Sequence, residues 1–105
     1  MKKIFISQPM NGLTDEEIKI NRSSAIKKLE KFMHGEEFEI IDSFFETAPH
    51  DAKPLWYLGE SLKLLAKADY ALFLAGWDQA RGCKIENTCA QEYGIQTIYE
   101  GSNLR

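Results

Sequence analysis

Four short apolar runs alternate along this chain with three longer segments that have helical patterns. The apolar runs are residues 3–7, 38–41, 71–74 and 95–99. Strands that alternate with helices form a parallel sheet, because each return to the same end of the sheet needs a crossover connection. The alternation therefore predicts a doubly wound α/β fold of the flavodoxin or Rossmann kind, with helices on both faces of a sheet of four to five strands.

The expected strand order is 2-1-3-4, which follows from right-handed crossovers in a doubly wound sheet. The winding direction then reverses between the first and third strands, and open α/β sheets bind their ligands at such a reversal. Two turn-rich loops follow these strands, at residues 7–12 and 76–82. We therefore expect both loops to face one crevice at the carboxyl edge of the sheet.

The first helix is marked at its start and along its buried face. Thr14, followed three residues later by Glu17, forms a capping box, and the helix is expected to run to about Met33. Apolar residues recur along it at close to the helical period: Ile18, Ala25, Ile26, Leu29 and Phe32. This stripe predicts the face that packs on the sheet.

The remaining helices also have recognisable ends. Pro54 suits the first turn of a second helix, and Gly94 suits the end of a third helix that begins near Gly82. Residues 42–53 are expected to form a loop, and residues 100–105 to form a surface tail.

Length and charge limit what the chain can be. Its 105 residues suit one domain, spanning residues 1–105. The net charge of −3 disfavours a nucleic-acid-binding role, which needs a concentrated basic face. We find no signal peptide and no apolar run of membrane-spanning length, so we expect no membrane partner and a cytoplasmic location.

Cysteine and histidine usage predicts no metal site. Cys83 and Cys89 lie six residues apart on one expected helix and so on different faces, where they cannot easily pair. The chain has two histidines and no Cys-x-x-Cys motif.

Glu86 is the strongest candidate for a functional side chain. It lies about one turn inside the third expected helix, after a strand and a glycine-rich turn. The partial positive charge at a helix start favours its ionised form. A carboxylate held there could act as a nucleophile or bind sugar hydroxyls, although an acidic residue in the first turn of a helix is also common for structural reasons alone.

The loop that precedes this helix has three further candidates. Trp77 could stack on a planar base, Asp78 could act as an acid or base, and Arg81 could bind a phosphate or carboxylate. Each also has a structural alternative: packing for Trp77, capping of a turn for Asp78, and a surface ion pair for Arg81. Gly76 and Gly82 frame this loop.

The loop after the first strand offers hydrogen-bonding groups to the same crevice. Its backbone N–H groups, the Ser7 hydroxyl and the Gln8 and Asn11 amides can all bind a ligand, and Pro9 stiffens the loop. The candidate binding residues here are Ser7, Gln8, Pro9, Met10, Asn11 and Gly12. An aromatic, a carboxylate and an arginine across from these groups suit a nucleoside or nucleotide.

Three blocks of the sequence resemble the nucleoside 2-deoxyribosyltransferase-like superfamily, and more narrowly a small bacterial and phage branch of it. The blocks are residues 4–12 (IFISQPMNG), 58–69 (LGESLKLLAKAD) and 76–86 (GWDQARGCKIE), followed by Ala90 and Gly94. The superfamily carries its nucleophilic glutamate four residues after a glycine at the start of this helix. Gly82 and Glu86 keep that spacing.

The resemblance implies chemistry at an N-glycosidic bond. Glu86 would attack the anomeric carbon to form a glycosyl-enzyme, and water or a second base would then take the sugar. Neither a metal nor an organic cofactor is implied. The resemblance also implies a homo-oligomer, most simply a dimer, and the aromatic residues Trp56, Tyr57 and Trp77 on so small a domain point the same way.

The chain departs from the superfamily pattern at Ser61. The enzymes usually place an aspartate on the second helix, eight residues before an acidic residue that here is Asp69. With Ser61 in that place, the leaving base lacks its expected proton donor, unless Asp78 supplies the proton. The alternative is a non-catalytic module that binds or sequesters a nucleotide in the same pocket.

Overall fold

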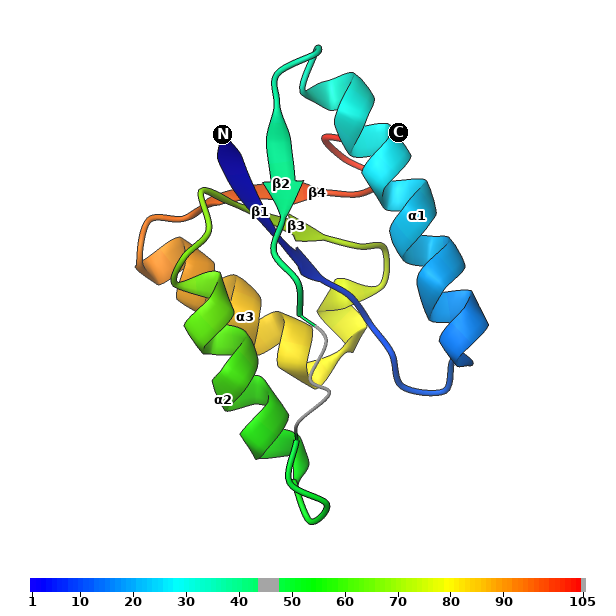
Figure 1. Ribbon diagram of the computed structural model, residues 1–105, viewed down its shortest axis with the longest axis vertical. Helices are drawn as coiled ribbons and strands as arrows, with labels where there is room; N and C mark the ends of the chain where they lie inside the picture. Colours follow the sequence, from blue (N-terminus) through cyan, green and yellow to red (C-terminus); the bar gives the residue numbers. More distant parts are fainter. Residues whose placement is uncertain (44–47, 105) are drawn as a thin grey trace.

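Within residues 1–43 and 48–104, the part of the chain that the computed structural model describes, four strands alternate with three α-helices (Figure 1). Residues 44–47 of the loop expected at 42–53, with Phe44 and Phe45, lie outside this part, as does Arg105. The elements are β1 (Lys2–Ser7), α1 (Asp15–Phe32), β2 (Phe38–Ile40), α2 (Pro54–Leu65), β3 (Tyr70–Phe73), the 3₁₀ turn η1 (Trp77–Gln79), α3 (Arg81–Glu92) and β4 (Gln96–Tyr99).

The four strands form one parallel sheet in the order β2-β1-β3-β4, which confirms the predicted fold class and strand order. Ser7, the last residue of β1, lies opposite Phe73 of β3, which in turn lies opposite Tyr99 of β4. The carboxyl ends of these three strands therefore lie at one edge of the sheet. β1 and β3 are the central strands, so their adjoining loops are the ones placed at the winding reversal.

The two faces of the sheet are covered by different helices, as predicted (Figure 1). Successive side chains of a strand point to opposite faces. On one face, Ile4 and Ile6 of β1 pack with Leu29 of α1. On the other face, Phe5 packs with Leu65 of α2 and Ala90 of α3, so the core consists of two apolar layers on either side of the sheet.

α1 begins with the predicted capping box. The Thr14 side chain accepts a hydrogen bond from the Glu17 backbone N–H at 3.1 Å, and the Glu17 carboxylate accepts one from the Thr14 N–H at 3.0 Å. The predicted stripe is wrong at one position, because Phe32 is exposed and Met33 is buried in its place. Met33 lies four residues after Leu29 and so continues the same face of the helix.

The C-terminal tail differs from the surface tail that we predicted. Leu104 is only 1% exposed and belongs to the apolar layer beneath α1, beside which the chain ends in Figure 1. A turn at Gly101, whose φ is +89°, brings the chain back, and the Gly101 N–H donates to the Leu104 carbonyl at 2.7 Å. Burial of one leucine side chain, worth about 1.5–3 kcal/mol, explains why the tail folds against the domain.

The loop expected at residues 76–82 contains the 3₁₀ turn η1, and α3 starts at Arg81, one residue earlier than predicted. Gly76 opens this turn with a φ of +88°, a left-handed conformation that side chains disfavour. A Cβ atom built there would lie 3.7 Å from the Cγ atom of Pro9. The two loops that follow β1 and β3 therefore lie next to each other, as the strand order requires.

Replacing Gly76 by alanine should lower the free energy of unfolding by about 1–2 kcal/mol, because a left-handed residue with a side chain costs roughly that much. Gly59→Ala is the matched control, since Gly59 lies within α2 and an added Cβ would meet nothing within 4 Å. The control should raise stability by about 0.5–1 kcal/mol. Urea denaturation of both variants measures this, and equal effects would contradict the left-handed assignment.

Candidate functional site

The edge of the sheet brings Ser7 and Glu86 into direct contact, although 79 positions separate them in the sequence. The Ser7 hydroxyl donates a hydrogen bond of 2.6 Å to Oε1 of Glu86. Ser7 is 1% exposed and Glu86 is 7% exposed. Ser7 ends β1 and Glu86 lies in the second turn of α3, so two of the predicted site residues meet at the carboxyl edge of the two central strands.

The partly buried Ser61 on α2 and the buried Cys83 on α3 also lie near this carboxylate. Burial raises the pKa of Glu86 above its ordinary value, and hydrogen bonds from the hydroxyls of Ser7 and Ser61 offset only part of that rise. Burial also raises the pKa of the Cys83 thiol, the neighbouring Ser7 offsets part of that rise, and the charge of Glu86 adds to it. The surroundings thus disfavour the ionised form of both groups. For Glu86 this is the reverse of the prediction from the helix start, because burial outweighs the partial positive charge there.

Cys83 was not among the predicted site residues. Its place near Glu86 could have been found from its spacing, because residues three apart on a helix lie on the same face and Glu86 is three residues after Cys83. Ser61 was singled out only through the family resemblance, as the residue at the expected aspartate position, and its contact with Glu86 was not predicted. The sequence of α2 alone does not show which of its faces α3 meets.

Glu86 takes part in neither of the ion pairs recorded among the described residues. Those pairs join Lys28 to Glu100 and Lys63 to Glu60. Burying a carboxylate without a cationic partner costs free energy, and such perturbed groups concentrate at functional sites. This arrangement fixes the orientation of the Glu86 carboxyl group. Within the described residues, the groups that donate hydrogen bonds to it are hydroxyls. A carboxyl group held in this way can act as a nucleophile or exchange a proton.

Trp77 packs against two other aromatic side chains. Its ring centroid lies 5.5 Å from that of Phe73 and 5.4 Å from that of Tyr99. The Tyr99 hydroxyl accepts a hydrogen bond of 2.8 Å from the amide of Asn87, the buried neighbour of Glu86. The structural alternative for Trp77 is therefore confirmed, and because the ring is only partly buried, stacking on a base stays a prediction.

The other candidates of the second loop lie at the surface. Asp78 in η1 and Arg81 at the start of α3 are both exposed, and Gly82 is partly buried. In the first loop, Met10, Asn11 and Gly12 are exposed too, and the Leu13 N–H donates to the Met10 carbonyl at 3.1 Å across a turn. The loops therefore present their polar groups to solvent next to the buried Ser7–Glu86 pair.

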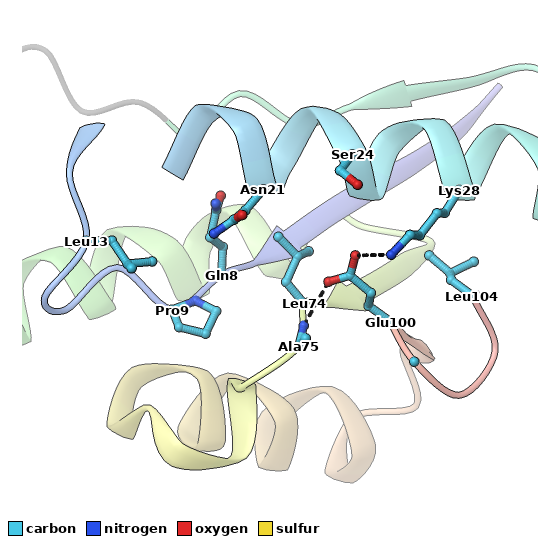
Figure 2. Close-up of a pocket in the computed structure, with 11 residues that line it drawn as sticks. Gln8, Pro9, Leu13, Asn21, Ser24, Lys28, Leu74, Ala75, Glu100 and Leu104 are labelled. Atoms are coloured by element: carbon cyan, nitrogen blue, oxygen red, sulfur yellow. Dashed lines mark hydrogen bonds and ion pairs between the residues drawn. The ribbon is translucent and has the colours of Figure 1, made fainter. Parts of the chain in front are cut away.

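The single crevice that we predicted is divided by the sheet. Ser7 points toward α3, whereas the amide nitrogen of the next residue, Gln8, donates at 2.7 Å to the Ile18 carbonyl of α1. Gln8 and Pro9 line a pocket of about 400 Å³ on the α1 side, and Glu86 is not part of its wall (Figure 2). The pocket residues are Gln8, Pro9, Leu13, Asn21, Ser24, Lys28, Leu74, Ala75, Glu100, Gly101 and Leu104.

No group of three or more His, Cys, Asp or Glu side chains in residues 1–43 and 48–104 could hold a metal ion. Across the same residues, no helix has both the length and the apolar character needed to cross a membrane.

Residues 2–99 match the model of a protein family described as Domain of unknown function (DUF4406), and the chain belongs to this family. No curated protein matches the chain. No solved structure matches it either.

Replacing Glu86 by glutamine should increase stability relative to the wild type at pH 8 but not at pH 4. Below the ordinary glutamate pKa of 4.5 the carboxyl is protonated in both the folded and the unfolded chain. As the pH rises, the unfolded chain ionises first, and the raised pKa makes ionisation in the folded protein unfavourable. The wild type therefore loses stability that the glutamine variant keeps.

Urea denaturation between pH 4 and pH 8 measures this difference. Glu30→Gln, at an exposed position on α1, is the matched control and should change stability by less than about 0.5 kcal/mol throughout. A glutamine variant at position 86 that becomes less stable than the wild type as the pH rises would show that the ionised carboxylate stabilises the fold.

Proposed function

We propose that this protein cleaves or transfers the N-glycosidic bond of a (deoxy)nucleoside or a nucleoside 5′-monophosphate, with Glu86 as the nucleophile. The observation that carries the proposal is the buried Glu86 carboxylate, held at 2.6 Å by Ser7 beside the two loops at the carboxyl edge of the sheet. The resemblance to the nucleoside 2-deoxyribosyltransferase-like superfamily supports the same assignment.

Glu86 takes part in both steps of the proposed reaction. A carboxylate oxygen bonds to the anomeric carbon as the bond from that carbon to the base nitrogen breaks, and the electron pair leaves with the base. Water then attacks the anomeric carbon of the ester and gives its proton to Asp78, which the first step leaves ionised, and the carboxylate is released. In a transfer, a second base takes the place of water and gives up its N–H proton in the same way. The hydrogen bond from Ser7 fixes the orientation of the carboxylate during both steps.

The departing base needs a proton, and Ser61 cannot supply it as a carboxylic acid would. Asp78 is the acid that we assign to this role, because it is exposed in η1, the turn that leads into the helix of Glu86. General acid catalysis typically contributes about 10²–10⁴-fold in rate. Arg81, exposed at the start of the same helix, is suited to a 5′-phosphate.

A second candidate function is the non-catalytic binding of a nucleotide at the same site. The specific feature in its favour is Ser61, which lies close enough to Glu86 to lower the pKa of that carboxyl and stands where the enzymes of the resembling superfamily carry an aspartate. Binding needs no proton donor, so this function would tolerate a serine there.

Release of free base distinguishes the two functions. We expect the wild type to release base from at least one member of a panel of nucleosides, deoxynucleosides and their 5′-monophosphates, measured by liquid chromatography. Glu86→Gln should abolish release, and Asp78→Asn should slow it about 10²–10⁴-fold. Glu30→Gln should have no effect. Turnover that survives Glu86→Gln would exclude the nucleophile, and intact substrates with the wild type would favour the binding module.

We also propose that the protein forms a homodimer and works in the cytoplasm, where reduced thiols such as the free Cys83 and Cys89 persist. The family resemblance supports the dimer, and the exposed large apolar residues Leu55 and Tyr57 of α2 and Tyr93 after α3 could lie in its interface. Light scattering should give twice the chain mass of 12.0 kDa, whereas a mass near 12.0 kDa would exclude the dimer.

A further inference from the structure

Two of the seven glycines of this chain are not explained by their backbone conformation. The other five have a positive φ, which side chains disfavour. Gly59 and Gly82 lie within the helices α2 and α3 and have no positive φ. Alanine has a higher helix propensity than glycine, so the backbone alone would favour alanine at both positions.

The packing around Gly82 does not require a glycine either. A Cβ atom built there would meet no heavy atom of the described residues within 4 Å, and the residue is partly exposed. At Gly76, by contrast, the corresponding atom would lie 3.7 Å from the Pro9 side chain. The space beside Gly82 is therefore open, and a side chain could enter it without a clash.

This open space adjoins the candidate nucleophile. Gly82 and Glu86 are four residues apart and so lie on the same face of α3 in successive turns. Side chains of a helix lean toward its N-terminus, so the Glu86 side chain leans toward the turn that contains Gly82. Ser7 and Cys83, which are 1% and 5% exposed, close other sides of the carboxyl group. A molecule that reaches Glu86 thus has its open approach beside Gly82.

We propose that Gly82 is the entrance to Glu86, and that the sugar ring of the substrate packs against its bare Cα atom when the carboxylate meets the anomeric carbon. Gly82 is then a specificity-determining residue, because a side chain there would occupy the space that the pentose needs. The identity of the ligand rests on the proposed function, whereas the entrance itself can be tested without turnover.

Gly59 provides the matched control. It shares with Gly82 the helical backbone, the partial exposure and a Cβ position that meets nothing within 4 Å. The residue one turn after it is the exposed Lys63, which pairs with Glu60 at 2.7 Å. A side chain at position 59 therefore enters similar free space without approaching Glu86.

Carbodiimide labelling of Glu86 tests the entrance. A water-soluble carbodiimide adds to a protonated carboxyl group, an added amine then displaces it to leave an amide, and peptide mass spectrometry locates the product. We expect labelling of Glu86 in the wild type, slower labelling in Gly82→Ala and none in Gly82→Val. Gly59→Ala and Gly59→Val should be labelled as the wild type is, and the exposed Glu30 should be labelled equally in every variant.

The urea midpoint of Gly82→Ala should equal or exceed that of the wild type, so slower labelling would not come from unfolding. A wild type that is labelled at Glu30 but not at Glu86 would overturn the proposal. Equal labelling of Glu86 in the wild type and Gly82→Val would overturn it too, as would a lower urea midpoint with faster labelling, which would show that the glycine has a structural role.

Base release separates a failure of the entrance from a failure of the proposed function. Gly82→Ala should lower kcat/KM about 10²-fold, because a substrate displaced by about 1 Å can lose that much. Gly59→Ala should keep the wild-type value. Full activity of Gly82→Ala with none in Glu86→Gln would overturn the entrance and support the nucleophile. The expected labelling with no base release by the wild type would support the entrance and overturn the glycosidic reaction.

Discussion

The alternation of side chains along β1 is the constraint on which both the Ser7–Glu86 contact and the pocket beneath α1 depend. β1 is a central strand, so Ser7 and Gln8, adjacent at its end, are held between two different helix layers. Ser7 reaches Glu86 of α3, and Gln8 reaches the Ile18 carbonyl of α1. A shift of β1 by one residue would exchange the two faces, and the shorter serine side chain would then stand where the amide bridges to α1.

Much of the fold could be predicted, because the signals for the helix ends are local and the strand order follows from the right-handed crossovers between parallel strands. The capping box at Thr14 and the stop at Gly94 depend on a few adjacent residues. At Gly94, whose φ is +74°, the Ile95 N–H donates to the Ala90 carbonyl at 2.8 Å and closes α3 as a glycine cap does. The meeting of Ser7 and Glu86 followed from the strand order, since parallel strands bring their carboxyl ends to one edge.

The pocket beneath α1 could not be predicted, because its walls depend on the path of the C-terminal tail. Lys28 and Glu100 lie 72 positions apart, and no local pattern pairs them. The small and polar residues of the tail suggested an exposed end, but the single apolar Leu104 outweighs them once Gly101 turns the chain. Asn21, Ser24 and Lys28 of α1 form one wall of this pocket.

The energetics of Glu86 support the proposal that this residue serves chemistry, because burial of its carboxylate lowers the stability of the fold. Hydrogen bonds to a charged group contribute about 1.5–3 kcal/mol each, while removing an unpaired ion from water costs several kcal/mol. The raised pKa shows that Ser7 and Ser61 do not offset the desolvation. A glutamine, or an apolar residue of similar size, would fill the same space at lower cost. Stability alone therefore does not explain a carboxylate here, whereas the nucleophile of the proposed reaction requires one.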